Sequence, residues 1–313
     1  MFLGVDGGGT KTSYAIIDPD GVIRARHIGP SVSHLAQGFT RATDVLLEGI
    51  STILQKAALT PADLTYAFIG LPSYGEDSAT TDQMDLMPAR LLDAARYRCG
   101  NDMICSWAGS LACADGISVI AGTGSMAYGE YAGQTARAGG WGELIGDEGS
   151  AYWIAREGMN LFSRMSDGRA PRGLLYDLVR ARVGLKVDLD LCAQVYGEGI
   201  SARSAFAAFA PLVHEAAQAG DTQAADIFRR GADELLQCVQ AVRRSLQVPD
   251  DVALPVSNTG GVFQGGGLML DAFRAALAKA HPPFAYQEPR YQPDIGAALY
   301  AARLVGRQLT PVV

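Results

Sequence analysis

A short strand, a glycine-rich turn and a second strand occur twice in this chain, near residue 7 and again near residue 122. The first copy contains the turn Asp6–Thr12, and the second contains Gly122–Ser125 after the apolar run Ile117–Ala121. We interpret this similarity as a weak internal repeat at the scale of a domain. It predicts two halves built on one plan, and 313 residues are enough for two domains of ordinary size.

The spacing of apolar residues predicts the elements of the first half. Strands are expected at Phe2–Asp6, Thr12–Asp18, Val22–Ile28 and Thr65–Leu71, and helices from Gln37 to Ala58 and over Asp85–Arg98. Another strand is expected after the second helix, before a segment of small residues opens at Asn101. Three strands followed by helix, strand, helix and strand form the ribonuclease H-like pattern.

The second half combines strands with a long helical segment. Strands are expected at Ile117–Ala121 and Met126–Tyr131, helices through most of 149–246, a last strand at Val252–Val256, and helices from Gln264 to Ala280 and from Asp294 to Leu304. No low-complexity linker separates the two halves. This continuity favours a hinged, two-lobed α/β protein.

Composition excludes several classes of function. The net charge of −7 argues against a nucleic-acid or anionic-membrane surface as the main function. No apolar run approaches the ~20 residues of a membrane span, and the first residues do not read as a signal peptide. The 5 cysteines contain no C-x-x-C pair, so we expect buried or incidental thiols in a reducing cytoplasm. The 4 histidines are scattered, which gives little support to a histidine metal site or a catalytic triad.

The first glycine turn has the residue types that bind phosphate. Gly8 and Gly9 allow backbone N–H groups to approach phosphate oxygens, and Thr10 and Lys11 add donors. Asp6 ends the preceding strand and offers a hard oxygen for Mg²⁺ or its waters. The alternative is a plain glycine-rich hairpin. It is not a Walker loop, because a strand rather than a helix follows.

The second turn, with Thr123 and Gly124, is a weak signal by itself and a stronger one as the partner of the first. Two such hairpins in equivalent positions are expected to cover the β- and γ-phosphates of a nucleotide.

Asp102 lies between the two turns in the sequence. Phosphoryl transfer to an alcohol needs a carboxylate that orients the hydroxyl and accepts its proton, and position makes Asp102 the candidate. The alternative is an ordinary N-cap for a helix that starts at Met103.

Residues 139–150 combine five glycines, three carboxylates and a tryptophan. Asp147 and Glu148 precede a predicted helix, where acidic residues are favourable in any case. Carboxylates and backbone groups also bind sugar hydroxyls, and an aromatic plane such as Trp141 often lies beside them. Trp141 is equally compatible with a role as a core anchor.

Two further glycine positions suit the adenine–ribose side of a nucleotide. Gly260 and Gly261 follow a predicted strand and precede a helix, so the backbone can approach a ligand closely. Gly220, before Asp221, lies between two predicted helices and could close over the same base. The alternative for this pair is an interhelical turn with a capping aspartate.

Together these residues resemble those of N-acetylglucosamine kinase and its relatives in the actin-like ATPase and sugar-kinase superfamily. The resemblance covers nearly the whole chain, and the run Gly139–Ile154 is its most specific part. It implies an α/β fold of two ribonuclease H-like lobes with a nucleotide cleft between them. The first lobe would comprise residues 1–115 plus 293–313, and the second, enlarged by a helical insertion, residues 116–292.

The resemblance also assigns the nucleotide side of the site. Asp102 matches the catalytic aspartate, and Thr10 and Thr123 match the two phosphate-loop threonines. Gly260 and Gly261 match the adenosine loop. ATP with Mg²⁺ near Asp6 is the implied cofactor set, and a cytoplasmic homodimer is the implied assembly.

On the sugar side, Gly140, Trp141, Gly142 and Asp147 match the family's sugar-binding residues. The implied reaction is phosphorylation of the 6-hydroxyl of N-acetylglucosamine or glucosamine. Ser33 stands where the family usually has an asparagine that contacts sugar hydroxyls. A muramic-type sugar and glucose therefore stay open as substrates.

Three rival functions share parts of this pattern. An ATPase activator of a dehydratase or reductase would need interface cysteines for an iron–sulfur cluster, and none lies near the second phosphate turn or the adenosine loop. A sugar sensor without catalysis conflicts with the intact Asp6 and Asp102 and with both threonines. A zinc-containing sugar kinase would need a cysteine cluster that this chain does not have.

Overall fold

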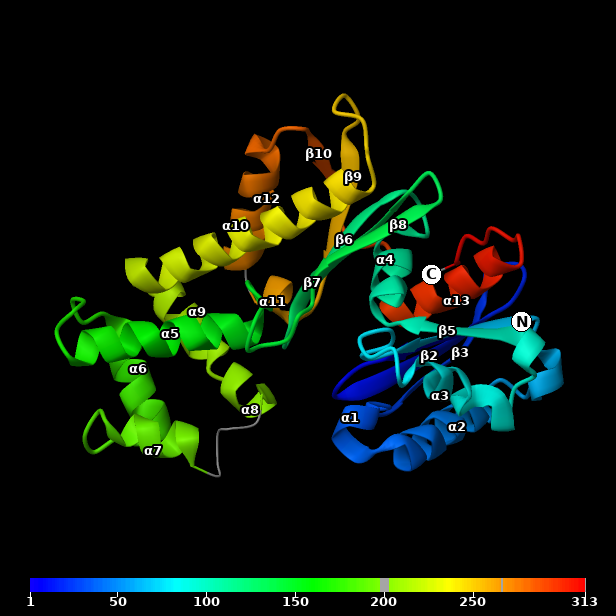
Figure 1. The fold of residues 1–313 in the computed structure, drawn as a ribbon, viewed down its shortest axis with the longest axis horizontal. Coiled ribbons are helices and arrows are strands. Elements are labelled where there is room, and N and C mark those ends of the chain that lie inside the picture. The colour runs from blue at the N-terminus through cyan, green and yellow to red at the C-terminus, as the bar shows by residue number, and fades with distance from the viewer. Residues whose placement is uncertain (198–202, 266, 313) are drawn as a thin grey trace. The chain divides into compact units, whose positions relative to one another are not determined.

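The computed structural model describes residues 1–197, 203–265 and 267–312 (Figure 1). Its contacts divide the chain into two compact units. Unit 1 comprises Met1–Asp115 and Glu288–Val313, and unit 2 comprises Gly116–Gln287. The chain therefore leaves unit 1 once and returns to it before the last helix.

Unit 1 contains a mixed sheet of five strands in the order β3-β2-β1-β4-β5. The strands are β1 (Phe2–Gly7), β2 (Lys11–Ile17), β3 (Ile23–Pro30), β4 (Tyr66–Leu71) and β5 (Tyr97–Asn101). The first three are antiparallel to one another, whereas β1, β4 and β5 run parallel. Parallel strands place their carboxyl ends at one edge of the sheet, which is where ligands bind in such sheets.

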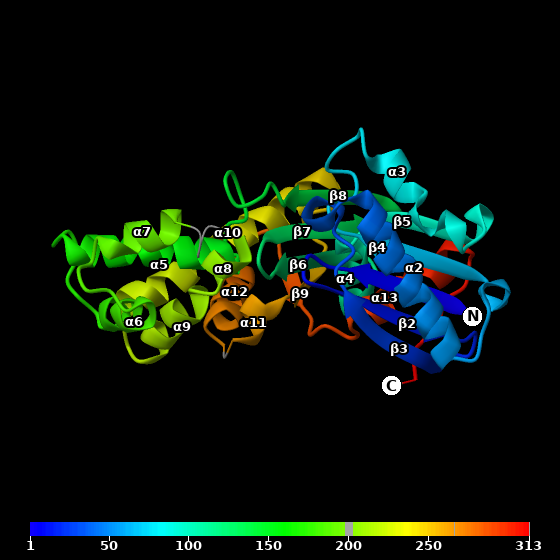
Figure 2. The same ribbon diagram turned by 90° about the horizontal axis from the view of Figure 1, so that it is seen from below.

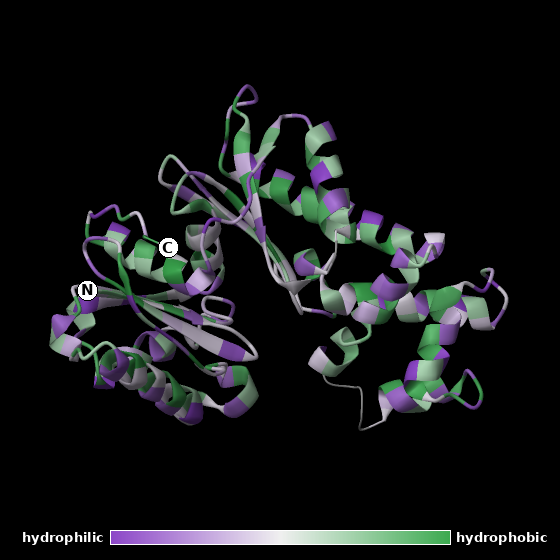
Figure 3. Ribbon diagram, turned by 180° about the vertical axis from the view of Figure 1, so that it is seen from behind, coloured by the Kyte–Doolittle hydropathy of each residue, from purple (hydrophilic) through white to green (hydrophobic). Residues whose placement is uncertain are grey.

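Helices cover both faces of the unit 1 sheet. The apolar face of α2 (Phe39–Lys56) packs into one core, and Figure 3 shows hydrophobic and hydrophilic residues along this helix. On the other face lie α4 (Met103–Leu111) and α13 (Pro293–Leu304). A Cβ at Gly4 of β1 would lie 2.2 Å from the backbone N of Ala298 in α13. Glycine at this position therefore allows α13 to lie directly on the sheet.

The prediction of a helix over Asp85–Arg98 is wrong. The segment instead contains α3 (Thr81–Asp85), two 3₁₀ turns (Met87–Arg90 and Ala94–Arg96) and then β5. Pro88 restricts its predecessor and cannot donate a helical hydrogen bond. Asp93 begins the second turn by accepting the amide of Ala95 at 2.9 Å. The apolar residues here are spaced for short turns against α2 rather than for one helix.

Unit 2 contains a second five-stranded sheet with the same topology, in the order β8-β7-β6-β9-β10. The strands are β6 (Gly116–Ala121), β7 (Ser125–Tyr131), β8 (Gln134–Gly139), β9 (Leu254–Thr259) and β10 (Phe284–Tyr286). Again the first three are antiparallel and β6, β9 and β10 are parallel. The predicted repeat of one ribonuclease H-like plan is confirmed.

The helices of unit 2 form a large apolar core with its sheet. They are α5 (Ala151–Ser166), α6 (Leu174–Val183), α7 (Asp190–Tyr196), α8 (Arg203–Ala207), α9 (Ala210–Gln218), α10 (Thr222–Ser245), α11 (Gly261–Gln264) and α12 (Leu268–Lys279). Figure 2 shows α5 to α9 extending away from the strands of this unit. Among the described residues, no helix is long and apolar enough to cross a bilayer.

Two sequence-based predictions in unit 2 are only partly right. The strand expected at Val252–Val256 lies at Leu254–Thr259, and it is not the last strand, because the three-residue β10 comes later in the chain. The helix expected from Gln264 to Ala280 begins at Leu268, as α12, and the four-residue helix α11 precedes it. Gly267 has φ of +95°, which a regular helix cannot accommodate.

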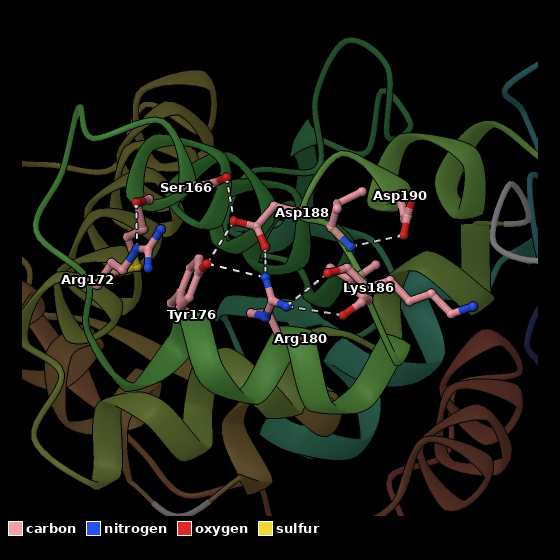
Figure 4. A network of polar contacts seen from close by, with 10 residues as sticks. Ser166, Arg172, Tyr176, Arg180, Lys186, Asp188 and Asp190 are labelled. Atoms are coloured by element: carbon pink, nitrogen blue, oxygen red, sulfur yellow. Dashed lines mark hydrogen bonds and ion pairs between the residues drawn. The ribbon is translucent and has the colours of Figure 1, made fainter.

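A polar network fixes the loop between α6 and α7 (Figure 4). Asp188 Oδ2 accepts hydrogen bonds from Ser166 Oγ at 2.7 Å and Tyr176 Oη at 2.8 Å, and its other oxygen pairs with Arg180. Arg180 also donates to the carbonyl oxygen of Leu185 at 3.2 Å. One carboxylate therefore joins the end of α5, the residues Tyr176 and Arg180 of α6, and the loop that follows α6.

Candidate functional site

In unit 1 the parallel strands bring Asp6 and Asp102 to the same edge of the sheet. Asp6 is near the end of β1 and is aligned with Gly70 of β4, which is in turn aligned with Gly100 of β5. Asp102 follows β5 directly. The two carboxylates predicted for metal binding and catalysis thus lie at the same edge of the sheet, at the ends of β1 and β5, with β4 between them.

Gly70 allows the start of α4 to approach the sheet closely. A Cβ at this position would lie 2.3 Å from Cys105 Sγ and 3.2 Å from the Cα of Asp102. Both distances are shorter than ordinary van der Waals contacts. The absence of a side chain at Gly70 therefore sets how near Asp102 lies to β4.

The N-cap alternative for Asp102 receives no support from its side chain. Asp102 occupies the N-cap position of α4, but it makes no capping hydrogen bond. Asn101 performs that role: its Oδ1 accepts the amide of Met103 at 3.0 Å, and its Nδ2 donates to the carbonyl of Tyr74 at 3.0 Å. The carboxylate of Asp102 is thus not needed to start the helix.

The surroundings of both carboxylates favour their protonated forms. Both residues are half-buried at this edge of the sheet. Burial, followed by the charges of Asp6 and Glu76, raises the pKa of Asp102 well above its usual range. Burial and the charge of Asp294, opposed by Lys11, raise the pKa of Asp6 to about 7. Perturbed carboxyl groups of this kind are typical of functional sites.

The first phosphate turn is held from two sides. The amide of Gly8 donates to the carbonyl of Lys11 at 2.9 Å, which closes the turn. Ser31 Oγ donates to the carbonyl of Gly8 at 2.8 Å and accepts the amide of Ser33 at 3.1 Å. Ser31 was not predicted from the sequence, since no motif marks it. Thr10 is exposed at the tip of the turn.

Ser33 is buried at the start of α1 (His34–Gln37) and does not cap that helix through its side chain. Its backbone is tied through Ser31 to the first phosphate turn. Its hydroxyl can therefore contribute to a ligand without breaking the helix.

The residues near Asp6 fit a magnesium ion that is held mainly by its nucleotide. Mg²⁺ normally takes one or two carboxylates, with waters and phosphate oxygens completing its coordination. The charge of Asp6 raises the pKa of Asp102, and a divalent cation would relieve that repulsion. No group of three or more metal-ligating side chains occurs in the described part of the chain, so a closed protein cage is not the arrangement here.

In unit 2 the second phosphate turn is joined to residues 139–150 by hydrogen bonds. Ser125 Oγ donates to the carbonyl of Glu148 at 2.6 Å, and the amide of Gly140 donates to the carbonyl of Ser125 at 3.0 Å. The amide of Ala151, the first residue of α5, donates to the carbonyl of Gly122 at 2.8 Å. The predicted phosphate turn and the predicted sugar-binding segment therefore form one structural group. Thr123 is exposed on it.

Asp147 is buried in this group and has a positive φ of 59°. Its Oδ1 accepts the amide of Ser125 at 3.3 Å, and its Oδ2 pairs with Arg203 of α8. Arg203 also pairs with Glu143 at 3.1 Å. Burial raises the pKa of Asp147, and the guanidinium of Arg203 opposes that rise.

Arg203 is a member of this group that was not predicted from the sequence. A Cβ at Gly124 of the phosphate turn would overlap its guanidinium, so Arg203 lies against both the turn and Asp147. Arg203 is far along the chain in a helical region, and no local motif identifies it. Only the packing of α8 against α5 brings it here.

Trp141 is 71% exposed, which excludes the core-anchor alternative. Leu144 and Ile145 in the same loop are also exposed. Gly140 and Gly142 have positive φ values of 73° and 83°, and a Cβ at Gly140 would lie 2.3 Å from Met126 Cε. The loop thus presents an aromatic ring and backbone groups at the surface of unit 2.

The adenosine-loop glycines lie at the end of β9. Gly260 has φ of +104°, and a Cβ there would lie 2.2 Å from the carbonyl oxygen of Ala121, just before the second phosphate turn. Gly261 starts α11 and faces open space. The two glycine segments of unit 2 therefore adjoin each other.

Gly220 lies in the turn between α9 and α10, with φ of +96°. Asp221 caps α10 by accepting the amides of Gln223 and Ala224, and it also accepts the amide of Leu175 at 3.2 Å. This capping accounts for the turn without a ligand. A nucleotide contact for Gly220 stays a prediction.

Two sheets of identical strand order, each with a glycine turn after its first strand, define an actin-like ATPase fold. The chain belongs to the BadF/BadG/BcrA/BcrD ATPase family, which matches residues 3–301.

Two curated relatives match nearly the full length. The N-acetyl-D-glucosamine kinase of Dictyostelium discoideum is 28% identical over 310 residues, 96% of this chain and 97% of that protein. The N-acetylmuramic acid/N-acetylglucosamine kinase of Clostridium acetobutylicum is 29% identical over 306 residues, again 96% and 97%. A crystal structure from Chromobacterium violaceum, provisionally assigned as an N-acetylglucosamine kinase, is similar with a TM-score of 0.74 at 27% identity, covering 95% of this chain and 97% of that one.

Proposed function

We propose that this protein is an ATP-dependent kinase of an amino sugar that phosphorylates the 6-hydroxyl group, with N-acetylglucosamine as the first candidate and glucosamine as the second. The observation that carries the proposal is Asp102, a carboxylate at a strand end that leaves helix capping to Asn101. The names of the two curated relatives support the choice of an amino sugar. ATP as co-substrate gives the cytoplasm as the expected compartment.

In this proposal Asp102 orients the sugar hydroxyl and accepts its proton as the oxygen attacks the γ-phosphorus of ATP. The raised pKa of Asp102 suits that role, because a stronger base takes a hydroxyl proton more readily. Mg²⁺, when bound with ATP near Asp6, would neutralise charge on the phosphates. Gly8, Gly9, Thr10 and Lys11 supply donors for phosphate oxygens from unit 1.

Unit 2 supplies the second set of donors and the sugar contacts. Thr123 and Gly124 face the phosphates, and Gly260 and Gly261 receive the adenosine. Asp147, Gly140 and Gly142 bind sugar hydroxyls, and Trp141 offers an apolar plane. Arg203, which lies against Gly124 and Asp147, adds positive charge beside the phosphate turn.

The test is a coupled ADP assay with N-acetylglucosamine, glucosamine, N-acetylmuramic acid and glucose. We expect sugar-dependent ADP release with an amino sugar and a loss of at least ~10²-fold in turnover for Asp102→Asn, with ATP binding retained. Asp93→Asn, which removes a carboxylate from a surface turn of unit 1, is the matched control. Near-normal turnover of Asp102→Asn would rule out Asp102 as the base. A rate of ADP release that is the same with and without each sugar would favour an ATPase activator.

A further inference from the structure

A cavity of about 420 Å³ lies in unit 1 beside the C-terminal ends of α4 and α13. None of the residues assigned to the kinase reaction lines it. Arg290, Arg303 and Arg307 line the cavity, whereas no aspartate or glutamate does. The lining of this cavity is thus basic, in a chain that carries a net charge of −7.

The backbone that carries these arginines is fixed. The amide of Arg290 donates to the carbonyl of Ser110 in α4 at 3.1 Å, and the amide of Arg307 donates to the carbonyl of Ala302 in α13 at 3.0 Å. The segment after Arg307 is tied down as well, since the amide of Val312 donates to the carbonyl of Gly21 at 2.9 Å. The wall of the cavity is therefore preformed.

The three arginines differ in how they are held. Arg303 Nη1 donates to the carbonyl of Cys113 at 3.2 Å, and its guanidinium lies 5.3 Å from the ring centre of Trp107. The side chains of Arg290 and Arg307 make neither an ion pair nor a hydrogen bond with any residue that the structure describes. These two side chains have donors available for a ligand.

Helix dipoles do not cancel this charge. The C-terminal ends of α4 and α13 each contribute roughly −0.5 of an elementary charge, and both lie next to the cavity. Arginine carries a full charge at any physiological pH. Arg290 and Arg307, which form no ion pair in the part of the chain that the structure describes, therefore outweigh the two helix ends by about one charge. An anion is the partner that restores neutrality.

We propose that this cavity binds a phosphate monoester, carried by a small molecule such as a sugar phosphate or a nucleoside monophosphate. The planar guanidinium fork matches two phosphate oxygens at once, which makes arginine the usual residue for such recognition. The volume lies within the ~300–1,000 Å³ of small-molecule sites. Ala114 and Arg290, both in its lining, lie close to the ends of the two segments that make up unit 1.

The test is isothermal titration of the full chain with inorganic phosphate, N-acetylglucosamine 6-phosphate and AMP. We expect at least one ligand to bind at least about tenfold more weakly to Arg290→Gln/Arg307→Gln than to the unmodified chain. The matched control is Arg41→Gln/Arg98→Gln, which removes the same charge from two exposed arginines of unit 1 without a carboxylate partner. This control should bind as the unmodified chain does.

A second variant separates the cavity from the kinase site. Thr10→Ala/Thr123→Ala changes both phosphate turns and leaves the cavity intact, so it should keep the affinity that the arginine variant loses. The proposal is overturned when the threonine variant loses that affinity and the arginine variant keeps it, or when none of the three ligands binds at millimolar concentration. Sugar phosphate and AMP bind independently of turnover, so this result does not depend on the kinase assay.

Discussion

At the scale of single residues, Gly70 decides where the proposed base lies. Because a Cβ at Gly70 would overlap Cys105 and crowd the backbone of Asp102, Gly70→Ala should push α4 away from β4. We expect turnover to fall by about tenfold or more, with the fold retained at a cost of about 1–3 kcal/mol. Steady-state kinetics and thermal melts measure the two effects. Gly29→Ala is the control, since a Cβ there meets only ordinary contacts at 3.5 Å.

The pKa of Asp102 is the second prediction at this scale. Burial, and then the charges of Asp6 and Glu76, raise the pKa of Asp102. The proposed base is therefore ionised only at higher pH than an ordinary aspartate. As the pH is lowered, kcat/KM should begin to fall at a pH above the usual pKa range of an aspartate. Glu76→Gln removes one of these charges and should move that acid limb to lower pH. Asp77→Asn, next in the chain and exposed, should leave it in place. An unmoved limb in Glu76→Gln would contradict this assignment.

Single residues also mark the limit of prediction from sequence. The placement of Asp6 and Asp102 at one edge of the sheet could be predicted, because Asp6 lies near the end of β1, Asp102 directly follows β5, and the ends of parallel strands share one edge. The positions of Ser31 and Arg203 could not be predicted, because they depend on which loop or helix lies beside each predicted phosphate turn. Those neighbours are set by packing far along the chain, not by local spacing.

At the scale of elements, Asp188 holds the α6–α7 loop. Its hydrogen bonds from Ser166 and Tyr176 and its pair with Arg180 lower the pKa of its carboxyl group. A carboxyl group whose pKa is lower in the folded than in the unfolded protein stabilises the fold at pH values above its unfolded-state pKa. That contribution is lost as the pH falls through the folded-state pKa. Asp188→Asn should therefore cost about 1–2 kcal/mol at pH 7 and progressively less in acid.

Thermal melts from neutral to acidic pH measure this difference. Asp177→Asn, an exposed aspartate in the first turn of α6, is the matched control and should cost only a few tenths of a kcal/mol. Equal losses for both variants at pH 7 would refute the role of the Asp188 network.

Long, regular elements were predictable from the sequence, and short ones were not. The amphipathic pattern of α2 and the apolar runs of β1 and β6 carry strong periodic signals. The turns around Pro88 and the three residues of β10 are too short for any period, and their conformation depends on the neighbouring strand and helix. The repeat predicted a common plan for the two halves, whereas the strands β8 and β10, the strand order and these boundaries required the structure.

At the scale of the whole molecule, unit 1 depends on a helix that is distant in sequence. A Cβ at Gly296 of α13 would lie 2.1 Å from the amide nitrogen of Gly109 in α4. Gly296→Ala should therefore destabilise unit 1 by about 3 kcal/mol and leave unit 2 unchanged. Limited proteolysis should then cut first within residues 1–115. Gly29→Ala serves again as control, and equal protection of both units in Gly296→Ala would contradict their separate stability.

The return of the chain to unit 1 also has a consequence for synthesis. Strands β1 to β5 leave the ribosome early, but the apolar face that α13 covers stays open until residues 293–304 have been made. Throughout the translation of unit 2, that face is available to chaperones and proteases. An interrupted message would therefore yield a product with an uncovered apolar face, which cellular quality control recognises.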